Sequence, residues 1–232
     1  MKIALCFFGI LRNYDLVRES ILRNLINQLK TRGTLSIFAN FNAPEMIINQ
    51  RSSENGKIDV LAYEKFTSDT NCIPLLTQQK DCDLKLDFKQ IENIKDAWDD
   101  NHVSTRNMLR QLYSLNMVVA QLKENYDVVI CARADVKYLT KVRIKQPKEN
   151  VIYTPVFADR YGANDRFAYG SMNVMKSYAQ RQNYVEHYIK RHKRLASESF
   201  LYEYLKELKI KIKFEYILFV RIRLTGSVAQ YC

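Results

Sequence analysis

The chain has 232 residues, of which 47% are hydrophobic and 26% are charged, and its formal net charge at pH 7 is +11. The length suits one α/β domain, residues 1–232, and is short for two. The composition excludes a disordered, collagen-like or coiled-coil protein. Because no window approaches about 18 consecutive apolar residues, we expect no membrane span, and we interpret the apolar run 3–11 as a buried strand rather than a signal peptide.

The opening of the chain alternates between strand and helix patterns. Residues 2–10 form an almost unbroken apolar run, which is typical of a strand buried on both faces of a parallel sheet. Residues 15–30 change to helical spacing, with leucine and isoleucine on one side. Further strands are expected at 34–41 and 57–63, with turn residues between them. These elements predict a doubly wound nucleotide-binding half.

The middle of the chain begins with a stretch of no clear period. Residues 68–101 are rich in aspartate, and we expect an irregular insertion, either a functional lid or a poorly ordered segment. A strong helical pattern follows at 104–124, and a buried strand at 126–132 ends at charged residues. Later strands are expected at 151–154, 167–172, 210–216 and 219–222, the last two at sheet edges, and helices at 174–192 and 197–208.

The cysteine and histidine patterns argue against disulfides and zinc. The chain has an odd number of cysteines and no C-x-x-C pair, which fits a reducing cytosol and predicts a cytoplasmic protein. None of the three histidines is paired with a cysteine at ligand spacing, so we expect no structural zinc site.

Two strand ends carry residues suited to ligand binding, because ligands of open α/β sheets bind beyond the carboxyl ends of the strands. At the first, Gly9 permits close backbone approach and Arg12 can reach a base or a phosphate. The chain contains neither G-x-G-x-x-G nor a P-loop, so those two nucleotide sites are not predicted.

At the second strand end, Arg133 and Asp135 follow the buried strand directly. A carboxylate there suits a divalent cation that bridges two phosphates, while Arg133 would bind phosphate or neutralise Asp135. The alternative is an ion pair that only ends the strand. A literal Asp-x-Asp occurs at Asp81 and Asp83, but no apolar strand leads to it.

The order of several segments resembles that of small GT-A-type glycosyltransferases of bacterial surface glycans and large DNA viruses. The segments are KIALCFFGILRNYD, LSIFANFN, RQLYSLNMVVAQLKE, YDVVICARADV, DRFAYGSMNVM and SESFLYEYLKEL, and they cover nearly the whole chain apart from 68–101. The resemblance implies an α/β fold of the GT-A (Rossmann-like) type, with a mixed, mostly parallel sheet flanked by helices. It implies that Phe8, Gly9 and Arg12 border the nucleotide and that Asp135 holds Mg²⁺ or Mn²⁺. Since the chain has Arg-Ala-Asp in place of a full Asp-x-Asp, one expected metal ligand is missing.

The resemblance also directs attention to residues beside the donor sugar. Asp165 and Arg166 precede a strand, where Asp165 would act as general base or, alternatively, as a turn residue. Glu198 is a second candidate base at a helix start, where a carboxylate equally has a structural role. Ser114 is implied as a contact of the nucleotide.

Taken together, the sequence predicts a glycosyltransferase, hexosyl or pentosyl and inverting, that moves a sugar from a nucleotide-sugar to a glycan acceptor. Residues 181–223 contain 11 Lys and Arg against 5 Glu, so contact with an anionic membrane and a lipid-linked acceptor are also expected. The alternatives are a basic nucleic-acid-binding protein, which lacks a recognised binding motif here, and an inactive glycan-binding protein of the same fold.

Overall fold

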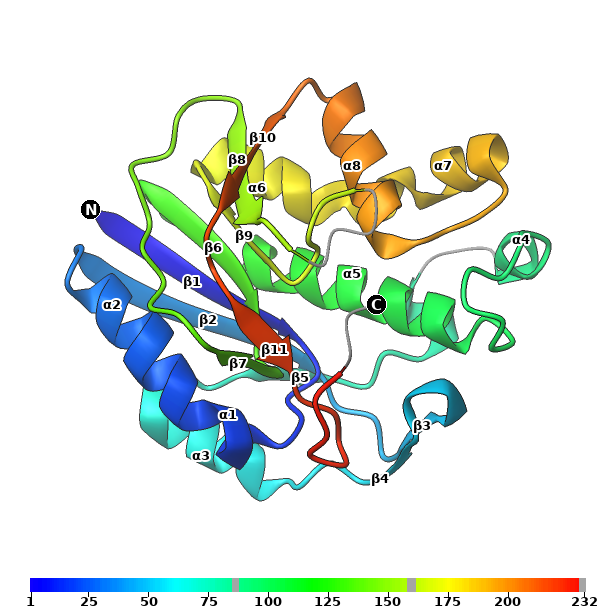
Figure 1. Cartoon of the computed structure of the whole chain (residues 1–232), viewed down its shortest axis with the longest axis horizontal. Coiled ribbons are helices and arrows are strands. Elements are labelled where there is room, and N and C mark those ends of the chain that lie inside the picture. The colour runs from blue at the N-terminus through cyan, green and yellow to red at the C-terminus, as the bar shows by residue number, and fades with distance from the viewer. Residues whose placement is uncertain (85–87, 158–161, 230–232) are drawn as a thin grey trace.

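A seven-stranded sheet forms the centre of the computed structural model, which describes residues 1–84, 88–157 and 162–229 (Figure 1). The strand order is β10-β8-β9-β6-β1-β2-β5. Neighbouring strands are parallel except around β9, which is antiparallel to both β6 and β8. The bounds are β1 (Lys2–Gly9), β2 (Thr34–Asn42), β5 (Leu75–Thr77), β6 (Val128–Arg133), β8 (Val151–Pro155), β9 (Phe167–Gly170) and β10 (Lys211–Glu215).

Helices cover both faces of this sheet because the buried strands are apolar on both sides. On β1, Ile3, Leu5 and Phe7 pack into one core with the first helices, whereas Ala4, Cys6 and Phe8 pack into a second core. The first face is covered by α1 (Tyr14–Ser20), η1 (Ile21–Ile26), α2 (Asn27–Lys30) and α3 (Leu61–Thr70). The second is covered by α5 (Val103–Ala120), α6 (Met172–Ala179) and α8 (Ser197–Glu207). The expected α/β class with a mixed, mostly parallel sheet flanked by helices is confirmed.

Two small antiparallel sheets lie beyond the carboxyl end of the main sheet. β3 (Ile47–Asn49) pairs with β4 (Glu54–Gly56), with η2 (Gln50–Ser52) at the turn, and β7 (Val136–Tyr138) pairs with β11 (Phe219–Arg221). After β11 the chain forms the 221–229 hairpin, in which the Arg223 N–H donates to the Ser227 carbonyl at 2.8 Å. The side-chain amide of Asn13 donates to the carbonyls of Arg223 and Leu224, at 2.6 and 2.5 Å, and fixes the hairpin beside the end of β1.

The main errors of the sequence-based assignment lie between β2 and α5. The strand expected at 57–63 is wrong: α3 begins at Leu61, whose N–H donates to the carboxylate of Asp59 at 3.0 Å. Ala62 and Phe66, four residues apart, both face the core, as helical spacing requires. The stretch 68–101 is also more regular than expected, since it contains the edge strand β5 with η3 (Asp81–Leu84) and α4 (Phe88–Glu92).

The end of the chain agrees with the sequence analysis more closely. The helix expected at 174–192 is divided into α6, η4 (Gln180–Tyr184) and α7 (Val185–His192). β10 lies at an edge of the main sheet as expected, whereas the strand expected at 219–222 pairs with β7 instead. Within the described ranges, no helix is both long enough and apolar enough to span a membrane.

Candidate functional site

A cavity of about 620 Å³ opens at the carboxyl ends of β1, β2 and β6. Gly9, at the end of β1, has φ 95°, a conformation that favours glycine, and it turns the chain toward Arg12. The cavity is lined by more basic than acidic side chains: Arg12, Arg51, Lys80, Arg106, Arg110, Arg133, Arg166, Arg221 and Arg223 against Glu45, Glu54, Asp165 and Glu198. Such a lining attracts an anionic ligand.

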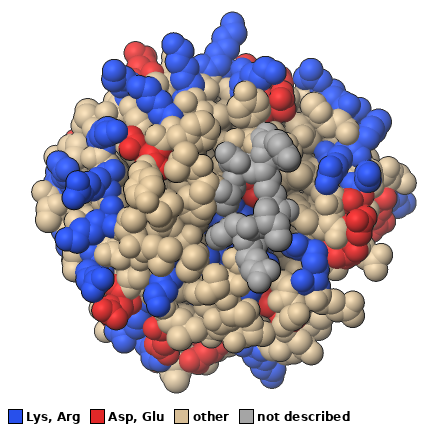
Figure 2. Space-filling model, viewed as in Figure 1, with Lys and Arg blue, Asp and Glu red and all other residues tan. Residues whose placement is uncertain are grey.

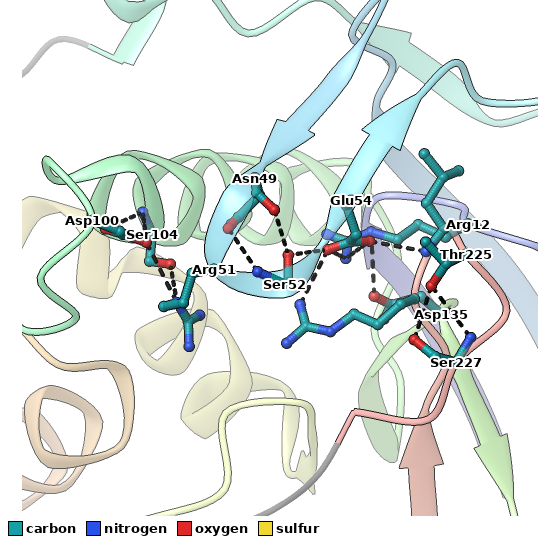
Figure 3. A network of polar contacts seen from close by, with 12 residues as sticks. Arg12, Asn49, Arg51, Ser52, Glu54, Asp100, Ser104, Asp135, Thr225 and Ser227 are labelled. Carbon is teal, nitrogen blue, oxygen red and sulfur yellow. Dashed lines mark hydrogen bonds and ion pairs between the residues drawn. The ribbon is translucent and has the colours of Figure 1, made fainter.

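Glu54 fixes two of these arginines at the end of the cavity nearest β1. Its buried carboxylate accepts two hydrogen bonds from Arg12 Nη1, at 2.8 and 3.0 Å, and one from Arg223 Nη1 at 3.2 Å (Figure 3). The Leu224 N–H and the Ser52 hydroxyl donate to the same carboxylate, at 2.9 and 2.6 Å. Burial alone would raise the pKa of Glu54, but Arg12 and these donors lower it below its usual value. Glu54 therefore joins β1, the β3–β4 hairpin and the 221–229 hairpin.

Asp135 lies behind this end of the cavity and is fully buried. Arg133 donates from Nε to Oδ1 at 2.7 Å and from Nη2 to Oδ2 at 2.5 Å, and Arg12 Nε lies 3.8 Å from Oδ2. Burial would raise the pKa of Asp135, but Arg133 and Arg12 outweigh burial and lower this pKa to about 2. Both oxygens of the expected metal ligand are thus engaged by a guanidinium group.

The rest of the described chain offers no better set of metal ligands. Among residues 1–84, 88–157 and 162–229, no group of three or more His, Cys, Asp or Glu is arranged to hold a metal ion. Asp81 forms ion pairs with Arg106 and Arg110, and the side chain of Asp83 lies outside the described residues. A divalent cation therefore does not fit the described residues, because it needs carboxylate oxygens that are not already paired with arginine.

Asp165 and Glu198 lie together on the cavity wall and share Arg166. Arg166 Nη1 is 3.4 Å from Asp165 Oδ1, and Arg166 Nη2 donates to Glu198 Oε1 at 3.1 Å. A Cβ at Gly162 would lie 2.0 Å from the Glu198 carbonyl oxygen, so the absence of a side chain there lets segment 162–166 reach the start of α8. Gln111 of α5 donates to Asp165 Oδ2 at 3.0 Å.

The two carboxyl groups differ in their acid–base properties. Burial, followed by the charge of Asp165, raises the pKa of Glu198 above its usual value. Burial acts in the same direction on Asp165, but Arg166 and Arg133 outweigh it and lower the pKa of that carboxyl. Glu198 therefore keeps its proton to a higher pH than an ordinary glutamate, whereas Asp165 stays ionised to a lower pH than an ordinary aspartate.

Arg221 brings a further guanidinium group to the same end of the cavity from β11. Burial, and then the nearby charges of Arg133 and Arg223, lower the pKa of Arg221 to about 9. Such a shift means that the positive charges repel one another where they are poorly solvated. An anion placed among them would relieve this repulsion. We call Arg12, Arg133, Arg166, Arg221 and Arg223 the arginine end of the cavity.

The opposite wall, which we call the tryptophan end, is formed by Trp98, Arg51, Met46 and Ile48. Asp96 holds the loop around Trp98 by accepting hydrogen bonds from the N–H groups of Trp98, Asp100 and His102, at 3.0, 2.8 and 2.9 Å. Arg51 lies 6.0 Å from the centroid of the Trp98 ring and donates to the Ser104 hydroxyl at 3.1 Å. Figure 3 shows Arg51, Ser104 and Asp100 on the other side of the β3–β4 hairpin from Arg12.

The structure brings together most of the residues singled out from the sequence. Those that line the cavity are Gly9, Arg12, Arg133, Asp165, Arg166 and Glu198. Phe8 instead packs in the core, and Ser114 is buried behind Gln79, whose side-chain amide donates to its hydroxyl at 2.7 Å. Sequence reasoning missed Glu54, Trp98, Arg221 and Arg223. Only Trp98, as the single tryptophan of an otherwise aperiodic segment, carried a signal in the sequence.

Comparison with known proteins gives structural likenesses only. No family model and no curated protein sequence matches the chain. The apo form of the glycosyltransferase GlyE of Streptococcus pneumoniae TIGR4 is similar at 12% identity and a TM-score of 0.45, over 91% of this chain and 44% of that one. This chain therefore spans less than half the length of GlyE.

Two further solved structures are similar over most of both chains. Mouse xyloside xylosyltransferase 1, also in apo form, has 11% identity and a TM-score of 0.46, over 92% of this chain and 84% of that one. The CTP:phosphocholine cytidylyltransferase LicC of Streptococcus pneumoniae has 10% identity and a TM-score of 0.46, over 96% and 94%. At these identities the likeness concerns the course of the chain and not its chemistry.

Proposed function

We propose that the chain is a glycosyltransferase that moves a sugar from a nucleotide-sugar donor to a glycan acceptor. The observation that supports this most strongly is the meeting, in one cavity beyond the strand ends, of the arginine end with the pair Asp165 and Glu198. Guanidinium groups match phosphate oxygens in charge and geometry. A carboxyl group with a raised pKa suits the removal of a proton from an attacking hydroxyl group.

In the proposed reaction the donor diphosphate lies against the arginine end, and the acceptor hydroxyl approaches Glu198. The acceptor oxygen forms a bond to the anomeric carbon, the bond from that carbon to the phosphate oxygen breaks, and the nucleoside diphosphate leaves with the electron pair. Glu198 takes the proton of the acceptor hydroxyl, while Asp165 stays ionised and holds Arg166 in place. With attack opposite the leaving group, the configuration of the anomeric carbon inverts.

We assign the acceptor to the tryptophan end. The half-buried indole of Trp98 offers an apolar plane against which a sugar ring can pack, and Arg51 beside it supplies hydrogen-bond donors. A lipid-linked acceptor and contact with an anionic membrane are part of this proposal. Lys and Arg side chains lie around much of the rim of the face in Figure 2, with smaller acidic groups between them.

A thermal-shift screen against UDP-, GDP-, CMP- and dTDP-sugars tests the proposal, because a ligand of the native state raises the unfolding midpoint by mass action. We expect a shift with one nucleotide family, and transfer of its sugar to a glycan acceptor. A salt-dependent shift with DNA or RNA, without any donor binding, would favour a nucleic-acid-binding protein instead. Donor binding without turnover on any acceptor would favour an inactive glycan-binding protein.

A further inference from the structure

The position expected to bind a divalent cation is taken up by arginine. Both carboxylate oxygens of Asp135 accept hydrogen bonds from Arg133, and Arg12 Nε lies 3.8 Å from one of them. A cation bound there would have to displace charge-assisted hydrogen bonds in a fully buried position. It would then lie next to guanidinium groups of the same sign, at a distance where the repulsion is strong.

Three of the four carboxylates that line the cavity are engaged in the same way, Glu45 being the exception. Glu54 accepts from Arg12 and Arg223, and Asp165 and Glu198 both pair with Arg166. The described residues therefore contain no group of three or more acidic, histidine or cysteine side chains arranged around a common metal position. Mg²⁺ requires at least one or two carboxylates that are available to it.

The same cavity already contains the positive charge that a metal would otherwise supply. Five arginines from four parts of the chain face it: Arg12 after β1, Arg133 at the end of β6, Arg166 before β9, and Arg221 and Arg223 at β11 and the hairpin that follows. The carboxylate of Glu54 holds both Arg12 and Arg223 in position, so their guanidinium groups are oriented before a ligand arrives. Preorganised donors of this kind stabilise developing negative charge without reorganising.

We infer that the arginine end, and not a divalent cation at Asp135, binds the diphosphate that leaves the donor. This inference deepens the proposed function and rests on it. The leaving nucleoside diphosphate gains its negative charge next to Arg221 and Arg223, while the proton from the acceptor goes to Glu198. Asp135 then has a positioning role, since it holds the guanidinium group of Arg133 at the cavity wall.

Calorimetric titration tests the inference with inorganic pyrophosphate and with the nucleotide-sugars, each in the presence of EDTA or of Mg²⁺. We expect the wild-type protein to bind pyrophosphate and one donor in EDTA, with Kd within about twofold of the value in Mg²⁺. Arg221→Ala should weaken pyrophosphate binding in EDTA by about tenfold or more, because it removes a charge-assisted contact. The matched control is Arg23→Ala, since the Arg23 side chain is 71% exposed, pairs with Glu19 at 3.9 Å and does not line the cavity.

Asp135→Asn distinguishes a metal site at Asp135 from binding of the diphosphate by the arginine end. If Asp135 binds a metal, the variant loses the donor binding that Mg²⁺ supports. If arginines bind the diphosphate, the variant still binds pyrophosphate and the donor, with the same Kd in EDTA and in Mg²⁺, and binding is weakened only in part because the amide oxygen still accepts a hydrogen bond from Arg133. The comparison of EDTA with Mg²⁺ needs no variant, so the inference remains testable if Asp135→Asn does not fold.

The possible outcomes separate the inference from the proposed function. Donor binding that appears only with Mg²⁺ would overturn the inference and leave the glycosyltransferase proposal standing. Pyrophosphate binding in EDTA with no binding of any nucleotide-sugar would support an arginine site for diphosphate and overturn the proposed function. Failure of pyrophosphate and of every donor to bind under either condition would overturn both.

Discussion

At the arginine end of the cavity, charged side chains are fixed by a buried carboxylate, whereas at the tryptophan end a loop is held by hydrogen bonds from its own backbone N–H groups to one aspartate. Arg12 and Arg223 share the carboxylate of Glu54, which is 2% exposed. The loop around Trp98 depends on Asp96, which accepts three backbone N–H groups near the surface. The first arrangement fixes the charges that the proposed reaction requires, and the second forms a wall that we expect substitutions to change at little cost in stability.

The largest effect is expected from Glu198→Gln at the arginine end. Because the amide cannot accept the proton, transfer should slow by about 100- to 10,000-fold, while donor binding changes little. In the wild type the base must be ionised, and the pKa of Glu198 is raised. As the pH is lowered, the rate should therefore begin to fall at a higher pH than an ordinary glutamate would cause. Initial rates as a function of pH measure both effects.

Glu203→Gln on the same helix is the matched control, because Glu203 pairs with Lys206 at the surface and does not line the cavity. It should keep the wild-type rate and pH profile. An unchanged acid limb in Glu198→Gln would exclude Glu198 as the base.

Glu54→Ala should cost about 3–5 kcal/mol of unfolding free energy, because it leaves the buried Arg12 and the half-buried Arg223 without their carboxylate. Denaturant titration measures this change. Glu19→Ala, which removes a carboxylate that is 88% exposed, should cost less than about 0.5 kcal/mol. Equal stability of Glu54→Ala and the wild type would show that Glu54 does not hold the two arginines together.

Trp98→Ala should raise the KM for the acceptor by roughly 3- to 10-fold and leave kcat and the donor KM nearly unchanged, since it removes one aromatic contact. Steady-state kinetics with each substrate varied in turn measures this difference. Trp98→Phe should recover part of the affinity. Tyr216→Ala, which removes an aromatic ring that is 72% exposed and outside the cavity, should change neither constant. A raised donor KM in Trp98→Ala would place the donor, not the acceptor, at this end.

The smallest effect is expected from Asp96→Ala, about 1 kcal/mol of unfolding free energy. Burial would raise the pKa of Asp96, but the N–H groups of His102, Trp98 and Asp100 lower it. Its stabilising effect should therefore be present above the usual aspartate range and be lost as the pH falls through the lowered pKa. Unfolding measured at neutral and acidic pH should show a smaller pH dependence in the variant. Asp99→Asn, at a neighbouring position with φ 53°, should match the wild type, because asparagine tolerates this conformation.

The sequence predicted the arginine end in large part because parallel strands bring their carboxyl ends to one edge. The apolar runs that became β1 and β6 located Arg12 and Arg133, and the predicted start of α8 located Glu198. Glu54 could not be predicted, because it lies on a three-residue strand and its partners are 42 and 169 positions away in the chain.

The wrong strand at 57–63 has a simple cause. The four residues 57–60 alternate in polarity, which fits a strand as well as the approach to a helix, and the sequence alone does not show which side faces a core. Asp59 was the available signal, since aspartate commonly precedes a helix, and its carboxylate does accept the Leu61 N–H. The tryptophan end was missed for a related reason, because a loop ordered by side-chain bonds to its own backbone has no period.

The position of the 221–229 hairpin has a consequence for synthesis on the ribosome. All seven strands of the main sheet have been translated by Glu215, before Arg221 and Arg223 exist. Because the first core also contains Ile217, Phe219 and Ile222, a chain that ends at Glu215 can pair its seven strands but leaves that core open until β11 has been added. Arg221 and Arg223 therefore arrive on the same segment that closes the core, so the cavity reaches its full positive charge only together with the completed fold.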